Sequence, residues 1–271
     1  GAVFPGFILV TLFILYILIY SYLKPEAAPL AIDRPPVKLN MVWHVIATIL
    51  PVVCLIFAVL GSIFMGIATV TEASGVGALG ATLLALFNKK LNWKVIKNVV
   101  HETFNTTGFI FGIFIGATCF ALVLRGLGGD ETIGALLRAI PFGDYGIIAV
   151  ILLLVFALGF FLDWIEITLI ILPLIAPVIS SLDLRVEGYG VADNPELVWF
   201  TVLVAVSLQT SFLTPPVGFA LFYLKGVSPP EIELLDIYKG VIPFIVLQLM
   251  GLLAVVFWPQ LVIWLPYIAY R

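Results

Sequence analysis

Two acidic residues, Asp163 and Glu166, lie in the middle of an apolar stretch that runs from residue 147 to residue 179. Their neighbours are almost all Leu, Ile, Val, Phe and Ala, the composition of a segment buried in hydrocarbon. An ionised carboxylate is costly there, so Asp163 has to face a cation, a polar solute, water or protein. The alternative for Asp163 is an interfacial loop. Glu166 shares its face of a helix and fits either a ligand or an interhelical hydrogen bond.

A second polar interruption, residues 209–218, reads Gln-Thr-Ser-Phe-Leu-Thr-Pro-Pro-Val-Gly. Pro215 and Pro216 lack backbone donors and cannot continue a regular helix, while Gly218 admits unusual backbone angles. The helix therefore has to open, and the freed carbonyls join nearby hydroxyls as oxygen ligands for an alkali cation. The half-helix that follows suits an anion at its N-terminus. The hydroxyls are those of Thr210, Ser211 and Thr214. A proline kink that only shapes helix contacts is the alternative.

A third polar segment, residues 66–75, contains Thr69, Thr71 and Glu72. Either threonine can cap a helix that begins near Glu72, because an acid is favourable in the first turn. The alternative is that Thr71 and Glu72 line a solute path. The Gly, Ala and Ser spacing that continues to Gly80 also favours close contact between helices.

The composition places these segments in a membrane. Of the 271 residues, 62% are hydrophobic and 11% are charged, and the mean hydropathy is +1.20. No soluble domain of this size hides so much apolar surface, so we predict an all-α polytopic membrane protein. The net charge of −3 comes without a basic stripe or recognition motif, which excludes a nucleic-acid-binding class. Cys54 and Cys119 read as small hydrophobes, and the isolated His44 and His101 indicate no metal site.

The hydropathy pattern predicts about six spanning or re-entrant units. We divide the chain into residues 1–42, 43–104, 105–239 and 240–271. The expected spans are residues 3–23, 43–65 with a possible kink at Pro51, 73–87, 109–124, 198–222 with its break, and 241–268. Residues 89–106 are expected to form an amphipathic helix on the membrane surface, and an element that couples to another subunit is the alternative. A short helix, residues 133–140, interrupts the loop 126–144, and loops cover 24–40 and 180–195.

Residues 147–179 fit a re-entrant helical hairpin better than two full spans. Each arm has about sixteen residues, which is short for a span. The connecting residues 160–167 are too apolar for a solvated loop and contain neither Lys nor Arg. We therefore expect the turn of the hairpin, with Asp163, to reach the middle of the bilayer.

The distribution of Lys and Arg predicts the orientation. Segments 24–42, 88–104 and 225–239 fall on one side of the membrane, and by the positive-inside rule this side is cytoplasmic. They hold Lys24, Arg34, Lys38, Lys89, Lys90, Lys94, Lys97, Lys225 and Lys239. The opposite side is rich in acids and contains the loop 180–195, which we expect to face outward.

Together these motifs resemble the large membrane subunit of tripartite ATP-independent periplasmic (TRAP) transporters. The matching residues are 66–73 (GIATVTEA), 161–163 (FLD) followed by Pro173 and Pro177, 193–195 (DNP) and 213–218 (LTPPVG). The resemblance is to the carboxyl-terminal half, so we expect the chain to be a fragment of a longer subunit. Val70 stands where the family usually has proline between two threonines, and the connection 182–193 is longer than expected.

The resemblance implies one half of an inverted-repeat elevator transporter, with a hairpin at about 147–179 and an unwound helix at about 210–218. It implies sodium-driven import of small organic acids across the bacterial inner membrane, with sodium as coupling ion and no organic cofactor. The implied partners are a periplasmic substrate-binding protein and a smaller four-helix membrane subunit. On this basis the candidates for sodium and substrate contacts are Asp163, Thr210, Ser211, Thr214, Pro215, Pro216 and Gly218, of which Asp163 and the three hydroxyl residues are the sodium ligands.

Other functions stay open at this point. A proton-coupled carrier or a channel would show uptake that follows pH and ignores sodium. An intramembrane enzyme could use Asp163 as an acid, but Glu166, three residues away, is a poor partner for two-sided chemistry. A structural subunit that transports nothing would have little use for two polar breaks at bilayer depth. We therefore expect a transporter and not an enzyme.

Overall fold

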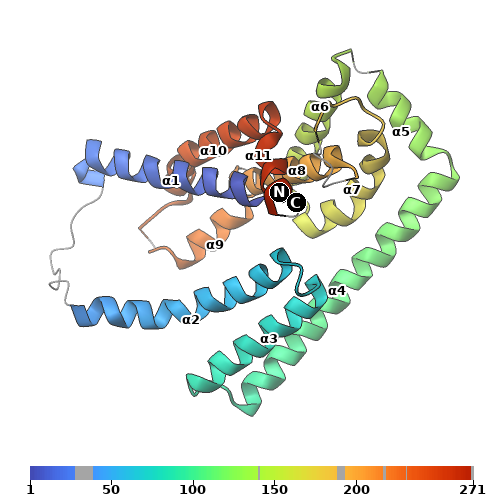
Figure 1. The fold of residues 1–271 in the computed structure, drawn as a ribbon. Coiled ribbons are helices and arrows are strands. Elements are labelled where there is room, and N and C mark those ends of the chain that lie inside the picture. Colours follow the sequence, from blue (N-terminus) through green and yellow to red (C-terminus); the bar gives the residue numbers. More distant parts are fainter. Residues whose placement is uncertain (28–38, 140, 188–192, 216–217, 230, 270–271) are drawn as a thin grey trace. The chain divides into compact units, whose positions relative to one another are not determined.

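The computed structural model describes residues 1–27, 39–139, 141–187, 193–215, 218–229 and 231–269, and all regular elements among them are helices (Figure 1). The elements are α1 (Val3–Leu23), the short 3₁₀ turn η1 (Pro25–Ala27), α2 (Leu39–Phe64), α3 (Val70–Phe87), α4 (Trp93–Gly126), α5 (Gly129–Arg138), α6 (Gly143–Leu158), α7 (Trp164–Ile179), α8 (Pro195–Leu213), α9 (Phe219–Val227), α10 (Leu234–Phe257) and α11 (Gln260–Ala269).

Six of the described helices are long and apolar enough to cross a bilayer: α1, α2, α3, α4, α8 and α10. Except on α8, whose apolar side chains are mostly buried, their apolar side chains lie largely on the surface, as on α2, where Phe57 is 72% exposed. Such surface is stable only against lipid or another hydrophobic chain. The prediction of an all-α polytopic membrane protein is therefore confirmed.

The chain folds into two compact units. The first contains Gly1–Ala28 and Ile110–Arg271, and the second contains Pro29–Phe109. The first unit holds α1, α5 to α11 and the later part of α4, and the second holds α2, α3 and the early part of α4.

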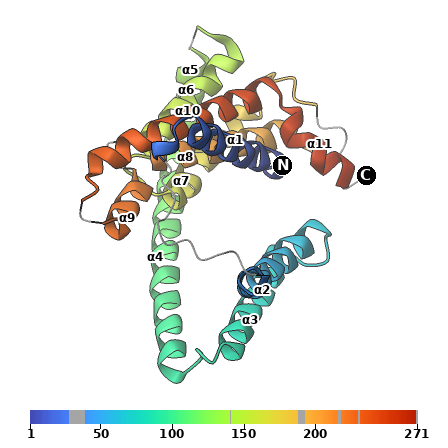
Figure 2. The same cartoon turned by 90° about the vertical axis from the view of Figure 1, so that its left-hand side faces the viewer.

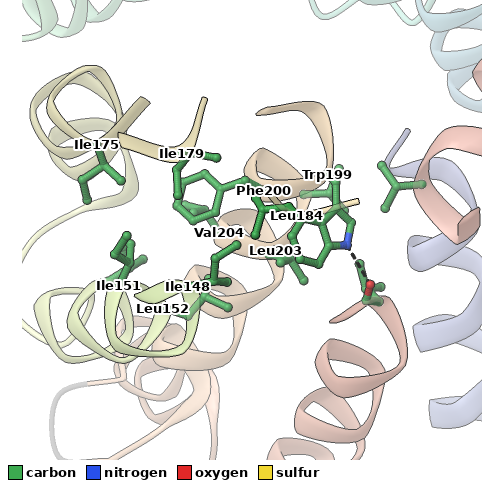
Figure 3. Close-up of a cluster of buried hydrophobic side chains, with 14 of the residues drawn as sticks. Ile148, Ile151, Leu152, Ile175, Ile179, Leu184, Trp199, Phe200, Leu203 and Val204 are labelled. Carbon is green, nitrogen blue, oxygen red and sulfur yellow. Dashed lines mark hydrogen bonds between the residues drawn. The ribbon is translucent and has the colours of Figure 1, made fainter. Parts of the chain in front are cut away.

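The core of the first unit lies where α6, α7 and α8 meet. Figure 3 shows Ile148 and Ile151 of α6, Ile179 of α7, and Phe200 and Leu203 of α8 interdigitating around one centre. Between helices in lipid, close contact and hydrogen bonds replace the hydrophobic driving force. These interlocking side chains thus hold the hairpin arms, α6 and α7, against α8.

A buried tryptophan joins the start of α8 to the end of α10. Trp199 has no exposed surface, and its indole Nε1–H donates to the carbonyl of Val255 at 2.8 Å (Figure 3). The residue four positions after Val255 is Pro259, which has no N–H to give. The proline leaves a carbonyl without a helical donor, and the tryptophan supplies one from another helix.

In the second unit, α2 and α3 run antiparallel in close contact. A Cβ built on Gly80 would lie 2.3 Å from Leu55 Cδ1, and one on Gly77 would lie 3.3 Å from Val59 Cγ2. The expectation that small residues up to Gly80 allow close helix contact is confirmed. The helix begins at Val70, three residues before the predicted span.

Two predicted boundaries are wrong. Residues 89–106 do not form a separate surface helix, because Trp93–Gly126 is one helix of 34 residues. No proline lies within it, and Gly108, where the predicted surface helix was to give way to the span, costs only about 1 kcal/mol in a helix interior. The predicted last span, 241–268, is in fact α10 and α11, separated at Trp258 and Pro259. The missing N–H of Pro259 ends the first of these helices.

Candidate functional site

Residues 147–179 lie in a helical hairpin that begins at Gly143. Its arms, α6 and α7, each have sixteen residues, as predicted. The turn is tight, because the N–H groups of Phe161 and Leu162 both donate to the carbonyl of Leu158 at 2.9 Å. Gly159 follows α6 directly, and Asp163 precedes α7 directly.

The two hairpin carboxylates hold the start of α7. Asp163 is its N-cap, and its Oδ1 accepts from the backbone N–H of Trp164 at 2.8 Å. Glu166 Oε2 accepts in return from the N–H of Asp163 at 3.3 Å, which completes a capping box. Both side chains are half-buried, and because a carboxylate has about four lone-pair sites, each keeps acceptor capacity beyond the cap.

A stripe of hydroxyl residues follows one face of α8: Ser207, Thr210, Ser211 and Thr214. Thr210 Oγ1 donates to Val206 O at 2.8 Å, Ser211 Oγ to Leu208 O at 2.7 Å and Thr214 Oγ1 to Thr210 O at 2.8 Å. A hydroxyl that gives its single proton to a carbonyl presents only lone pairs to any further neighbour. These oxygens are therefore arranged as acceptors, which is what a cation requires.

Ser207 was not among the residues predicted for the site. Its hydroxyl is buried and donates to the carbonyl of Leu152 on α6 at 3.3 Å. The signal was present in the sequence, since positions 207, 210, 211 and 214 follow the helical spacing of one face in an otherwise apolar helix.

The helix opens where the prolines predict it. Pro215 cannot donate to the carbonyl of Ser211, which accepts instead from the N–H of Thr214 at 3.1 Å. Because the backbone N–H of Thr214 is used in this way, it does not donate to the carbonyl of Thr210, as it would in a regular helix. The hydroxyl of Thr214 donates to that carbonyl instead, at 2.8 Å. The chain restarts at Gly218, which has φ +35° and is the N-cap of α9, with no side-chain hydrogen bond to that cap. The predicted residue Pro216 lies outside the described residues.

The turn of the hairpin and the open end of α8 meet at one point. A Cβ built on Gly159 would lie 2.2 Å from Ser211 Oγ and 2.9 Å from Ser211 Cβ. The glycine backbone therefore lies directly against the serine side chain, which has no exposed surface. Asp163 ends the same short turn, four residues further along. The turn of the hairpin and the end of α8, about fifty residues apart in the sequence, are thus in contact.

Thr71 and Glu72 belong to the second unit. Glu72 Oε2 accepts from the N–H and from the hydroxyl of Thr69, each at 2.8 Å, and Thr69 caps α3. Of the two predicted caps, Thr69 is the one used. Thr71 lies inside the first turn, where its carbonyl accepts from Ser74 Oγ at 2.6 Å.

A further polar group lies buried on α10. Gln248 has no exposed surface, and neither end of its amide has a hydrogen-bond partner among the described residues. One turn on, Gly251 approaches Leu9 of α1 so closely that a Cβ there would lie 2.5 Å from Leu9 Cδ2. A buried amide without partners costs about 1–3 kcal/mol, so Gln248 destabilises the fold unless something else satisfies it. The sequence signal was a lone amide in the apolar residues 241–257.

The donor set of the hairpin region fits an alkali cation better than a transition metal. Over the described ranges, no three His, Cys, Asp or Glu side chains gather in one place. The hydroxyl and carbonyl oxygens at the end of α8 remain, and such hard ligands suit an alkali cation.

Known proteins match most of the chain. The family described as "Tripartite ATP-independent periplasmic transporter, DctM component" matches residues 1–261. The sialic acid TRAP transporter permease protein SiaT of Haemophilus influenzae is 24% identical over 77% of this chain and 32% of its own length. An isethionate TRAP transporter permease protein of Oleidesulfovibrio alaskensis is 28% identical over 75% of the chain and 30% of that protein. The C4-dicarboxylate large permease protein of Rhodobacter capsulatus is 25% identical, with 78% and 46% covered. The chain therefore spans between 30% and 46% of the length of these relatives.

Proposed function

Because this chain belongs to the family of DctM components of tripartite ATP-independent periplasmic transporters, we propose that it forms part of the permease of a sodium-coupled importer of small organic acids. Permease subunits are not enzymes, so a catalytic role for Asp163 is set aside. The three relatives are named for sialic acid, isethionate and C4-dicarboxylates. What these solutes share is small size and negative charge, and the proposal for this chain extends no further than that class.

The contact between Gly159 and Ser211 carries this proposal. It joins the turn of an apolar hairpin to the open end of an apolar helix, and polar backbone at bilayer depth is tolerated only where it is buried in protein or lines a cavity. A transporter needs a polar region of this kind near the midplane, formed by discontinuous helices. A purely structural bundle does not.

Sodium would be held by oxygen atoms at the end of α8. The acceptor-only hydroxyls of Thr210, Ser211 and Thr214 supply the ligands, and Asp163 supplies a negative charge from the adjoining turn. Both Thr210 and Ser211 have no surface exposed to solvent, so a cation there would exchange its water for these oxygens.

The organic acid would bind at the start of α9 in preference to the start of α7. The N-terminus of α7 already has the carboxylates of Asp163 and Glu166 as hydrogen-bond acceptors. The N-cap of α9 is Gly218, which brings no side chain, and among the described residues no side chain caps this helix, so its positive dipole end is open to an anion. Bound sodium nearby would strengthen the attraction, and by linkage each ligand would raise the affinity for the other.

The partners and location follow from the family. We propose that the chain works in the bacterial inner membrane with a small four-helix membrane subunit, and that a periplasmic substrate-binding protein delivers the solute. The hairpin and the broken helix would carry the site between the two faces in an elevator-like motion. That the chain corresponds to the carboxyl-terminal half of the subunit stays a prediction. The family matches residues 1–261 of this chain, and this range does not say which part of a longer subunit they represent.

The test is uptake into proteoliposomes that contain the complete permease, its small subunit and its binding protein, with and without a sodium gradient. Thr214→Val removes a proposed sodium ligand and should raise the sodium concentration for half-maximal uptake by about tenfold, as expected for the loss of about 1.4 kcal/mol of binding. Thr214→Ser keeps the hydroxyl and should stay near the parent. Asp163→Asn should weaken the sodium dependence in the same direction.

The matched control is Thr201→Val. Thr201 lies on the same helix, and its hydroxyl donates to Leu197 O at 2.7 Å in the same manner, but it lies more than three turns from the break. Its sodium dependence should not change. Sodium dependence at the parental value in both Thr214→Val and Asp163→Asn would disprove the site, and uptake that follows a proton gradient alone would favour a proton-coupled carrier.

A further inference from the structure

We propose that the groove between α3 and the first turns of α4 binds an anionic phospholipid. The groove lies within the second unit and has a volume of about 470 Å³. Its walls include Ala78, Ala81 and Ala85 of α3 and Val95, Ile96 and Val99 of α4. Figure 2 shows these two helices meeting at the turn that connects them. This inference does not depend on the transport activity proposed above.

The walls of the groove suit a hydrocarbon chain. Small side chains on α3 face branched side chains on α4, and the one hydroxyl among the lining residues, Thr82, donates to Ala78 O of its own helix at 2.8 Å. From residue 78 to residue 85 the groove is about 10 Å long at 1.5 Å per residue, enough for part of an acyl chain.

The end of the groove is positively charged. Lys90 lies at this end, because its backbone N–H donates at 2.9 Å to the carbonyl of Ala85, a wall residue. Lys89 precedes it, and Lys94 and Lys97 follow on the first turns of α4. All four are exposed, and among the described residues none of them forms an ion pair with a carboxylate. Long lysine side chains bring their charge to the headgroup layer while their stems stay on apolar surface.

Charge complementarity decides which occupant fits. An anionic headgroup would neutralise this cluster while its acyl chain fills the groove. An apolar helix of another subunit would fill the groove but leave the lysines without a counter-charge. The exposed Trp93, beside Lys94, is the type of residue found at the membrane interface. The positive-inside rule also puts this turn on the cytoplasmic leaflet, where anionic lipids attract basic segments.

The experiment measures lipid retention by the purified complete permease in detergent, using native mass spectrometry. Phosphatidylglycerol should bind and phosphatidylcholine with the same acyl chains should not. Lys89→Gln and Lys90→Gln should each weaken retention by roughly fivefold, from the attraction expected for one lysine near an anionic surface. Ala81→Phe fills the groove from an exposed position on α3 and should weaken binding of the same lipid without altering the charge.

Two controls separate this site from general effects. Lys239→Gln removes a lysine on the same predicted side of the membrane, and Val76→Phe adds bulk to an exposed position of α3 outside the groove. Both should retain phosphatidylglycerol like the parent. Equal retention of the two lipids, or parental retention in the Lys90→Gln and Ala81→Phe variants, would overturn the proposal, as would a protein segment found occupying the groove.

Discussion

A single threonine compensates for the proline that opens α8. The backbone N–H of Thr214 serves Ser211 O, and its hydroxyl serves Thr210 O, so both carbonyls near the break have donors. A carbonyl left unpaired at this depth would cost several times the value of the hydrogen bond. Thr214 thus satisfies two of the carbonyls that Pro215 disturbs, and its hydroxyl oxygen stays available as an acceptor.

The close contact between Gly159 and Ser211 predicts that even one added methyl group at position 159 is harmful. Gly159→Ala would place that atom 2.2 Å from Ser211 Oγ, so the hairpin or α8 has to shift. Overpacking of this kind costs about 1–3 kcal/mol, and we expect a lower unfolding temperature in detergent and reduced uptake. Combining it with Ser211→Gly, which removes the obstructing side chain, should restore part of the stability.

Gly134→Ala is the control, because a Cβ on Gly134 of α5 meets nothing within 4 Å. It should leave both unfolding temperature and uptake unchanged. Additive losses in the Gly159→Ala, Ser211→Gly double variant would show that the two residues do not touch.

At the scale of helices, the start of α8 is bonded to a carbonyl of α10 that Pro259 leaves without a helical donor. Trp199 Nε1–H satisfies Val255 O, which Pro259 cannot serve. Trp199→Phe should lower the free energy of unfolding by about 1–3 kcal/mol, through the lost hydrogen bond and the smaller ring. Because alanine at 259 would bring back an N–H for Val255 O, Pro259→Ala should be less harmful in the Trp199→Phe background than alone. Thermal unfolding of the four variants measures this coupling.

Trp93→Phe serves as the comparison, since Trp93 is 80% exposed and should tolerate the change. If the effects of Trp199→Phe and Pro259→Ala on the unfolding temperature simply add, the backbone N–H at position 259 does not replace the indole N–H as the donor to Val255 O.

The elements that depend on local chemistry were predictable, and those that depend on distant contacts were not. Two apolar arms around Asp163 predicted the hairpin, and the double proline predicted the break after Leu213. The unbroken α4 was missed because its polar first half and apolar second half differ in composition, although nothing between them ends a helix. The meeting of Gly159 with Ser211, and of Trp199 with Val255, joins residues about fifty positions apart, for which a single sequence contains no local signal.

At the scale of the whole molecule, the charges predict which loops face which side. In a chain with Cys54 and Cys119 replaced by alanine, Glu187→Cys should react with a membrane-impermeant maleimide added to intact cells. Lys90→Cys should react only after the cells are permeabilised, because the positive-inside rule places it in the cytoplasm. Both parent residues lie in described loops or turns. Labelling of Lys90→Cys from outside would reverse the orientation, and with it the leaflet expected for the lipid groove.

Helix α8 is secured near one end and interrupted at the other. Its first turns are fixed by the indole of Trp199, and its last turn gives way at Thr214 and Pro215. Between these two points its buried side chains pack against α6, α7 and α10. A shift of the hairpin turn would therefore reach α8 directly through Ser211, while the indole hydrogen bond of Trp199 holds the beginning of the helix in place.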